Sequence, residues 1–222
     1  MNLIQSHAIP ADKQHQYNGI EPRAVLMGLI QQHSIRVVPS GQDFELSSGQ
    51  LSRVYCDLKK TLLRSDAAMP FTTCLHRLIQ NTPEFGGVGD TEKWAQAFAG
   101  VALGGCHLAS LAATSSYMSY QGFERHTIYI RKEAKQHGTK NLIEAPDLPQ
   151  GTRVILLEDV TTTANSAIKA LTCLQEAGYN VLGVVTVVDR RNAWEDVTPP
   201  MDVQGVPFRS LFRLEELVDR PV

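Results

Sequence analysis

Two adjacent carboxylates and a run of hydroxyl side chains stand together in one short segment. Residues 158–166 read Glu-Asp-Val-Thr-Thr-Thr-Ala-Asn-Ser and follow an apolar run at 154–157. Hydroxyls and backbone N–H groups at the start of a helix bind a phosphate dianion, helped by the positive end of the helix dipole. A carboxylate pair beside such a site suits ribose hydroxyls, a magnesium ion or a sugar ring that becomes cationic in the transition state.

The same residue types also have a purely structural interpretation. Thr, Ser and Asn favour helix N-caps for local reasons, and the acids would then be solvated. The local sequence leaves this alternative open. A carboxylate pair directly after an apolar run, followed by three threonines, favours the phosphate site.

A second polar segment, residues 129–140, is rich in basic side chains. Its potentially basic residues are Arg131, Lys132, Lys135, His137 and Lys140. A solvated surface loop is one interpretation of such a charge run. The functional interpretation is a mobile cationic lid over a polyphosphate, in which His137 donates a proton or a hydrogen bond to a leaving group.

Alternating strands and helices are expected to position these two segments. The pattern predicts strands over 98–103, 127–130, 154–158 and 181–188, and helices over 106–119 and 167–177. Such alternation is typical of a parallel α/β sheet. The unit formed by 154–188 is the clearest, because its strands are nearly continuous aliphatic runs and Gly178 is placed to end the helix between them. Since ligands bind beyond the carboxyl ends of strands in such sheets, the segment 158–166 lies where a site is expected.

The N-terminal part has a different pattern. Residues 1–20 are polar and aperiodic, and a capping helix is predicted over 24–33. Short strands are expected at 44–46 and 54–57. A helix is predicted over 67–80, with Ser65 or Asp66 as its N-cap and Pro70 in its first turn.

Composition narrows the class of protein. The chain has 222 residues, with 21 Lys and Arg against 23 Asp and Glu, and therefore a net charge of −2. This is an ordinary globular composition for one large domain, or for one domain with a small appendage. The near-neutral balance argues against a protein that wraps nucleic acid.

The sequence shows neither a targeting pattern nor a metal-binding pattern. The start of the chain shows no basic segment followed by an apolar one, and the longest apolar stretch is broken by glycines and a histidine, so we expect a cytoplasmic protein without membrane segments. The four cysteines form no CxxC pair and are expected to be reduced. The histidines show no metal-ligand spacing, so any metal should arrive with the substrate.

Four motifs together carry a family resemblance. FELSSGQLSRVYCD at 44–57, GVALGGCHLA at 100–109, YIRKEAKQHGT at 129–139 and VILLEDVTTTANSA at 154–167 resemble orotate phosphoribosyltransferase, a type I phosphoribosyltransferase, in that family's order. The resemblance covers about residues 24–218. It implies an α/β fold with a parallel sheet flanked by helices and a small N-terminal hood. Residues 21–222 would form a single domain, with the hood drawn from about 21–60 and C-terminal residues, and residues 1–20 would be an extension.

The resemblance also implies a reaction. Orotate attacks C1′ of phosphoribosyl pyrophosphate, giving orotidine 5′-monophosphate and pyrophosphate in de novo pyrimidine (UMP) biosynthesis, with Mg²⁺ carried by the pyrophosphate substrate. The family implies a homodimer whose lids reach into the neighbouring subunit's site.

The resemblance assigns roles by motif position. Lys135, His137 and Asp159 would be catalytic. The phosphoribosyl pyrophosphate site would comprise Arg131, Lys132, Lys135, His137, Glu158, Asp159, Val160, Thr161, Thr162, Thr163, Ala164, Asn165 and Ser166. Orotate would contact Thr162, Arg190, Tyr55 and Cys56, with Asp189 and Arg190 as the family's Asp-Arg pair, because a guanidinium can grip a carboxylate in bidentate fashion.

The residues alone leave some of these roles open. Arg190 could equally be a cation on the surface at the end of a strand. Tyr55 and Cys56 could equally be ordinary residues of the core. The family commonly has two glycines where this chain has Ala164 and Asn165. That difference predicts restricted positive φ and a narrower phosphate site.

Two other functions are alternatives to this one. A phosphoribosyltransferase for another base would turn over hypoxanthine, uracil or adenine and leave orotate inert. A phosphoribosyl pyrophosphate-sensing regulator would keep the fold without catalysis and would shift operator DNA or leader RNA in a gel. The lid cations and the net charge of −2 argue against the regulator.

Overall fold

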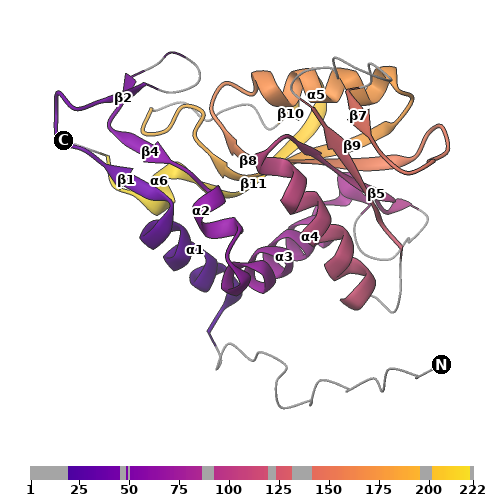
Figure 1. The fold of residues 1–222 in the computed structure, drawn as a ribbon, viewed down its shortest axis with the longest axis horizontal. Coiled ribbons are helices and arrows are strands. Elements are labelled where there is room, and N and C mark those ends of the chain that lie inside the picture. Colours follow the sequence, from indigo (N-terminus) through magenta and orange to yellow (C-terminus); the bar gives the residue numbers. More distant parts are fainter. Residues whose placement is uncertain are drawn as a thin grey trace, which may run out of the picture.

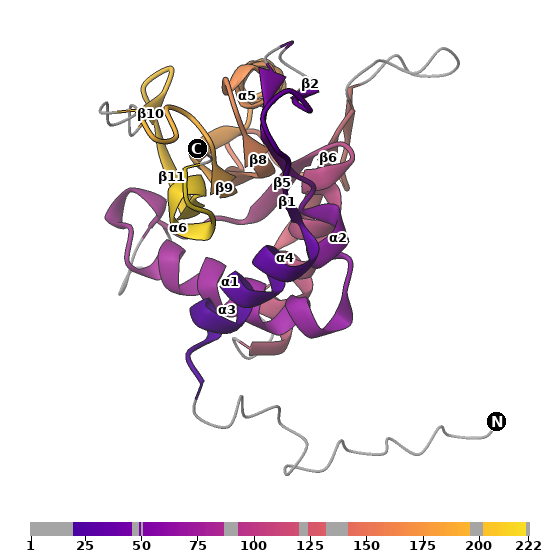
Figure 2. The same cartoon turned by 90° about the vertical axis from the view of Figure 1, so that its left-hand side faces the viewer.

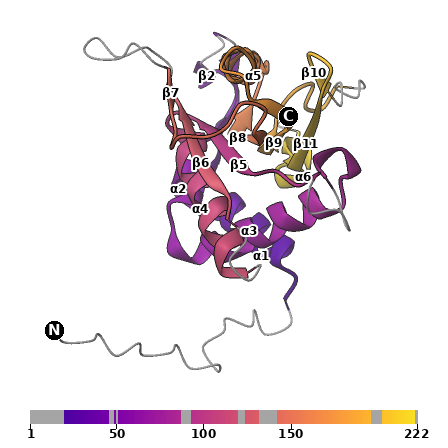
Figure 3. The same ribbon diagram turned by 90° about the vertical axis from the view of Figure 1, so that its right-hand side faces the viewer.

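The fold is built on one seven-stranded sheet with helices on both faces (Figure 1). The structure is a computed structural model that describes residues 20–45, 49, 51–86, 93–119, 124–131, 142–195 and 202–220. The strand order is β10-β11-β9-β8-β5-β6-β7. Figure 3 shows β6 and β7 at one side of the molecule and β10 and β11 at the other.

The central strands confirm the predicted parallel sheet. These are β5 (Ala97–Val101), β6 (His126–Ile130), β8 (Arg153–Thr161), β9 (Asn180–Asp189) and β11 (Val206–Arg213), and they pair with one another in parallel. The short strands β7 (Ile143–Glu144) and β10 (Asp202–Val203) add antiparallel pairings at the two ends of the sheet. The strand β8 carries a buried apolar run at 154–157, and most of β9 is apolar, because helices cover both faces of the sheet.

Two apolar cores result from the alternation of side chains along these strands. Ile155 and Leu157 pack on one face with α1 (Pro22–His33), α3 (Ser65–Gln80) and α4 (Gly104–Ser119). Val154 and Leu156 pack on the other face with α5 (Asn165–Glu176). Figure 1 shows the same layering, with α5 above the sheet and α3 and α4 below it.

The N-terminal residues build a hood beside the sheet. After α1, β1 (Ile35–Val37) pairs with β4 (Val54–Cys56), and β2 (Phe44–Glu45) pairs with β3 (Leu51–Ser52), both antiparallel. The short helix α2 (Lys59–Leu62) leads into α3, and a single turn, η2 (Pro83–Phe85), follows α3. The C-terminal helix α6 (Leu214–Leu217) contacts α1, where Arg23 pairs with Glu216 at 2.6 Å. Figure 2 shows β1 and β2 rising from α1 toward the side of α5.

Several predicted boundaries were wrong. The helix α3 begins at Ser65, and its N-cap is Arg64 rather than Ser65 or Asp66. Pro70 therefore lies inside the helix, where its ring removes the N–H that would bond to the carbonyl of Asp66. The strand β8 runs on to Thr161, three residues beyond its predicted end at Glu158, so Asp159 also belongs to the strand and not to the loop after it.

The unit β8-α5-β9 is close to its prediction. Gly178 ends the helix with a φ of 86°, and its N–H donates to the carbonyl of Gln175. Gly178 is therefore the left-handed glycine that the sequence predicts at the end of this helix. Within the described residues, no helix has the length and apolar character needed to cross a membrane.

Candidate active site

A cleft of about 470 Å³ lies between the hood and the carboxyl ends of the sheet strands. Val101 ends β5, Glu158 to Thr161 end β8, and Arg190 directly follows β9. The lining residues are Glu45, Tyr55, Cys56, Lys59, Val101, Ala102, Leu103, Gly104, Glu158, Asp159, Val160, Thr161, Thr162, Thr163, Ala164, Asn165, Ser166 and Arg190. The whole segment predicted from 158 to 166 thus lies at one site, together with the predicted orotate ligands Tyr55, Cys56 and Arg190 and with residues 101–104 of the motif at 100–109.

The start of α5 forms one wall of the cleft. The N-cap residue of this helix is Ala164, whose methyl side chain cannot accept a hydrogen bond from the first turn. The interpretation of this segment as an ordinary Thr or Asn helix cap is therefore wrong. Backbone N–H groups of the first turn and the positive end of the helix dipole face a cleft lined with threonine hydroxyls, which is the arrangement that binds phosphate.

Ala164 corrects a second expectation. Its φ is 61° and its ψ is 5°, so an alanine adopts the left-handed conformation that glycine would adopt freely. This conformation costs a non-glycine residue on the order of 1–2 kcal/mol. The side chain is only 8% exposed and packs in the same core as Ala167. Core packing therefore holds the loop in its turn, and alanine does not prevent positive φ here.

The acid pair is held in two different ways. Glu158 is 6% exposed and accepts a hydrogen bond from Thr161 Oγ1 at 3.0 Å. Asp159 is half-buried, and its Oδ1 accepts the backbone N–H of Val160 at 3.0 Å. Gly104, the first residue of α4, lies against the Asp159 carboxylate, where a Cβ would overlap it. The absence of a side chain at 104 thus lets this carboxylate face the cleft.

The turn from β5 to α4 forms the floor beside Asp159. Residues 102–104 line the cleft, and the peptide bond between Ala102 and Leu103 is cis. A Cβ on Gly100 would overlap the backbone of Gly105, and one on Gly105 would approach the carbonyl of Leu157 at 2.5 Å. Both glycines are therefore needed for the tight packing of this turn.

The hood supplies the opposite wall. Tyr55 and Cys56 line the cleft from β4, and the Tyr55 ring lies 5.2 Å from the ring of Phe44. Burial raises the pKa of the Cys56 thiol to about 12, so the thiol is neutral and a poor nucleophile at pH 7. A neutral sulfur and an aromatic ring make this wall suited to a flat, partly apolar ligand.

Arg190 reaches from the sheet to the hood. Its Nη2 donates to Ser52 Oγ at 3.1 Å and to the carbonyl of Val54 at 2.9 Å. Burial lowers the pKa of this guanidinium from its ordinary value, but arginine remains charged in proteins. A guanidinium held from one side in this way is prepared to bind an anion in the cleft.

Asp189 does not line the cleft. Its carboxylate is 2% exposed and accepts hydrogen bonds from Arg191 Nε at 3.0 Å, Arg191 Nη2 at 3.0 Å and Arg213 Nη1 at 3.2 Å. In the predicted Asp-Arg pair, the aspartate is therefore turned toward structural partners and only the arginine faces the site.

Most of the predicted lid lies outside the described residues, which include Arg131 but not Lys132, Lys135 or His137. Arg131 is exposed and pairs with Glu144 at 2.9 Å across the β6–β7 end of the sheet. It is not among the residues that line the cleft. Its predicted role stays a prediction.

Sequence reasoning missed several residues of the cleft, above all Lys59 and Glu45. Lys59 is the first residue of α2 and stands four residues after Tyr55. Its closeness in sequence to the motif that contains Tyr55 was the signal that could have found it.

Among the described residues, no group of three or more His, Cys, Asp or Glu side chains is placed to hold a metal ion.

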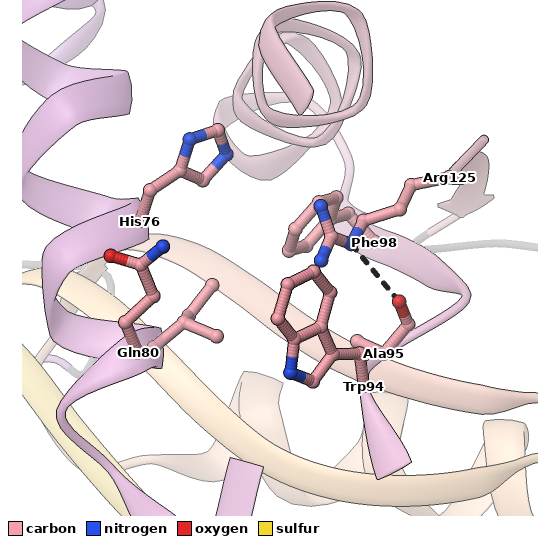
Figure 4. Close-up of a pocket in the computed structure, with 7 residues that line it drawn as sticks. His76, Gln80, Trp94, Ala95, Phe98 and Arg125 are labelled. Atoms are coloured by element: carbon pink, nitrogen blue, oxygen red, sulfur yellow. Dashed lines mark hydrogen bonds between the residues drawn. The ribbon is translucent and has the colours of Figure 1, made fainter. Parts of the chain in front are cut away.

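A second hollow lies near the amino ends of β5 and β6 (Figure 4). Arg125 lies 5.2 Å from the ring of Trp94 and 5.9 Å from that of Phe98, and its Nε donates to the carbonyl of Ala95 at 3.0 Å. The remaining space, about 20 Å³, is enough for a water molecule. His76 borders it, and burial lowers the pKa of this histidine to about 4. This hollow is too small for an organic substrate.

Comparisons with known proteins agree with this geometry. Residues 89–212 match the phosphoribosyl transferase domain family. The chain is 41% identical over 175 residues to an orotate phosphoribosyltransferase of Thermosynechococcus vestitus, covering 79% of this chain and 84% of that protein. It is 34% identical over 198 residues to an orotate phosphoribosyltransferase of Corynebacterium glutamicum, covering 89% and 95%.

Solved structures of phosphoribosyltransferases have the same fold as this chain. The Mycobacterium tuberculosis orotate phosphoribosyltransferase in complex with 5-phospho-α-D-ribosyl 1-diphosphate superposes with a TM-score of 0.61 at 28% identity, covering 88% of this chain and 98% of that one. A phosphoribosyltransferase from Corynebacterium diphtheriae superposes with a TM-score of 0.63 at 31% identity, covering 89% and 99%.

Proposed function

Because this chain belongs to the orotate phosphoribosyltransferase family, we propose that the cleft described above is the place where it joins orotate to ribose 5-phosphate. The enzyme transfers that group from phosphoribosyl pyrophosphate to orotate and releases pyrophosphate, a step of pyrimidine biosynthesis. The observation that carries the assignment to this cleft is the convergence of the α5 N-terminus, the acid pair and Arg190 on one space.

The start of α5 is proposed to bind the 5′-phosphate. Residues 161–166 supply hydroxyls and backbone N–H groups around the positive end of the helix dipole. A phosphate held here fixes one end of the substrate. The ribose then extends toward Glu158 and Asp159 at the end of β8.

The acid pair is proposed to bind the ribose hydroxyls. Leaving pyrophosphate makes C1′ electron-deficient, and Asp159 faces the developing positive charge. Glu158 is oriented by Thr161 and is the more buried of the two. Neither carboxylate needs to transfer a proton in this step, since their role is to orient the sugar and to stabilise charge.

Orotate is proposed to lie between Arg190 and the hood. Arg190 and Thr162 provide hydrogen-bond donors for the orotate carboxylate and carbonyl oxygens, and Tyr55 and Cys56 provide the wall along the ring. In this proposal the orotate nitrogen lies on the side of C1′ opposite to the pyrophosphate.

The remaining roles belong to the same proposal. Arg131, Lys132, Lys135 and His137 close over the pyrophosphate, and Lys135 and His137 assist its departure. Mg²⁺ arrives with phosphoribosyl pyrophosphate as part of the substrate. The enzyme is a cytoplasmic homodimer in which each lid serves the neighbouring site, and residues 21–222 form one domain. Exposed apolar side chains on α4, Tyr117 and Met118, at 57% and 76% exposure, support a covered face there.

The absorbance of orotate tests the reaction. Purified protein, phosphoribosyl pyrophosphate and Mg²⁺ are expected to remove the orotate band together, and omitting any one of them or adding EDTA is expected to stop the loss. If the band persists while the folded protein still binds phosphoribosyl pyrophosphate, orotate is not the substrate. Hypoxanthine, uracil and adenine are then tested in the same assay.

A further inference from the structure

Lys59 is a cation of the cleft that the reaction described above does not use. It is the first residue of α2 and lies in the cleft wall, where its side chain is 43% exposed. The next residue, Lys60, is exposed and does not line the cleft. The chain therefore places two neighbouring lysines in two different environments, one inside the site and one outside it.

Asp57 holds the Lys59 ammonium in place. Lys59 Nζ lies 2.8 Å from Asp57 Oδ1, and the Asp57 side chain is only 18% exposed. The Asp57 backbone is itself fixed, because its N–H donates to the carbonyl of Ser34 at 2.9 Å. An ammonium carries three N–H donors, so this contact leaves donors for a ligand. The hydrogen bond with Asp57 raises the pKa of Lys59, which keeps it charged at pH 7.

The electrostatic neighbours of Lys59 include residues at the β5–α4 turn. It interacts with Asp159 and with His107, whose ring bonds to the backbone of Leu103 in that turn, and also with Tyr55 and Cys56 of the hood. Arg190 instead bonds to Ser52 and Val54 in the hood. Of the two described cations, Lys59 is therefore the one with partners at the β5–α4 turn, whereas the hydrogen bonds of Arg190 go to the hood beside the proposed orotate site.

The charges of the cleft favour a role for Lys59 in binding an anion. Among the described lining residues, the acids are Glu45, Glu158 and Asp159 and the cations are Lys59 and Arg190. Both substrates are anions, and pyrophosphate carries several negative charges. An acidic cleft repels such a group unless a nearby cation compensates, and an ammonium in a partly buried site does this more strongly than one in water.

We propose that Lys59 binds the pyrophosphate group of phosphoribosyl pyrophosphate, from within the same subunit, on the side of the β5–α4 turn. Asp57 is the residue that positions it. This inference rests on the proposed function of the cleft. It adds a pyrophosphate ligand to the lid cations, and it assigns the two described cations of the cleft to different substrates.

Calorimetric titration with inorganic pyrophosphate and Mg²⁺ tests this assignment on the full-length protein. Losing a charge-assisted hydrogen bond is expected to weaken pyrophosphate binding about tenfold or more in both Lys59→Ala and Lys59→Gln. Lys60→Ala, the matched control, is expected to bind pyrophosphate like the wild type. Asp57→Asn is expected to have an intermediate effect. Circular dichroism and the unfolding midpoint establish that each variant is folded. Two different substitutions at Lys59 are used so that the test still holds if one of them does not fold.

Steady-state kinetics then separates the two substrates. The KM for phosphoribosyl pyrophosphate is expected to rise in Lys59→Gln while the KM for orotate stays within about twofold. Unchanged pyrophosphate binding in both folded Lys59 variants overturns the proposal, as does a rise confined to the KM for orotate. If the wild type does not convert orotate but Lys59→Gln still loses pyrophosphate affinity, the assignment of orotate is wrong and the role of Lys59 stands.

Discussion

Gly104 lies so close to the carboxylate of Asp159 that a methyl group at position 104 would overlap it. Gly104 begins α4, whereas Asp159 belongs to the end of β8, and the two are 55 positions apart in the chain. This contact joins the β5–α4 turn to the acid beside it at the end of β8. The direction of the acid therefore depends on a residue that has no polar side chain.

Gly104→Ala is expected to displace the Asp159 carboxylate and to lower turnover about 100-fold, because misplacing a reacting group by about 1 Å has effects of that size. Steady-state kinetics measures this change. Gly28→Ala is the matched control, since Gly28 is in α1 and a Cβ there meets nothing within 4 Å. Wild-type turnover in a folded Gly104→Ala protein would show that the position of Asp159 does not limit the reaction.

Substitutions at Ala164 are expected to depend on backbone conformation. Valine at a φ of 61° is β-branched and is expected to lower the free energy of unfolding by about 2 kcal/mol and to weaken phosphate binding. Glycine is expected to leave the free energy of unfolding within about 1 kcal/mol, because relief of the left-handed conformation is offset by greater entropy of the unfolded chain. Urea denaturation and titration with phosphoribosyl pyrophosphate measure both effects. Equal stability of the two variants would contradict the left-handed assignment.

Arg190 and Arg191 are expected to give opposite phenotypes although they are neighbours. Arg190→Lys removes the planar donor pair facing the cleft and is expected to raise the KM for orotate about tenfold or more, with little loss of stability. Arg191→Lys disturbs the buried Asp189 instead and is expected to lower the free energy of unfolding by about 1–3 kcal/mol while the KM changes little. Steady-state kinetics of both variants measures the KM for orotate, and urea denaturation measures the free energy of unfolding. A raised KM in Arg191→Lys alone would reverse the assignment.

Mixed dimers test whether the lids cross between subunits. Lys135→Ala and Asp159→Asn are each expected to lower turnover by about two orders of magnitude as homodimers. When the two proteins are unfolded, mixed and refolded, random pairing is expected to restore roughly a quarter of wild-type activity, because one intact site forms in each heterodimer. Verified heterodimers without this activity would show that each lid serves its own subunit.

His76 is expected to make stability depend on pH. Burial lowers its pKa from 6.5 to about 4, and Ser116 Oγ lies 3.1 Å from its Nε2. The unfolded chain therefore takes up a proton below pH 6.5 that the folded chain resists, so stability is full above 6.5 and falls as the pH drops toward 4. The loss from this residue is expected to reach up to about 3 kcal/mol. Urea denaturation at pH 7 and pH 5 measures it, and His76→Gln is expected to flatten the difference. An unchanged slope in that variant would remove His76 as the cause.

The amino-acid sequence by itself determined the central unit of the fold and the acid-hydroxyl segment. The aliphatic runs of β8 and β9 and the glycine after α5 are local signals, since burial on both faces and a left-handed stop each require particular residue types. The position of residues 158–166 at the carboxyl end of a parallel strand followed from that unit. The strands predicted at 44–46 and 54–57 correspond to β2 and β4 of the hood. The other short strands, β1, β3, β7 and β10, have too few residues to show a period of their own.

Only the tertiary structure decided which residues share the cleft and in which direction they point. Lys59 enters the site because the hood folds over the sheet, and Asp189 leaves it because two arginines from different segments hold its carboxylate. The left-handed turn at Ala164 runs against the local preference of alanine and persists because the core around it is packed. These features depend on contacts between residues far apart in the chain, and local residue preferences carry no information about such contacts.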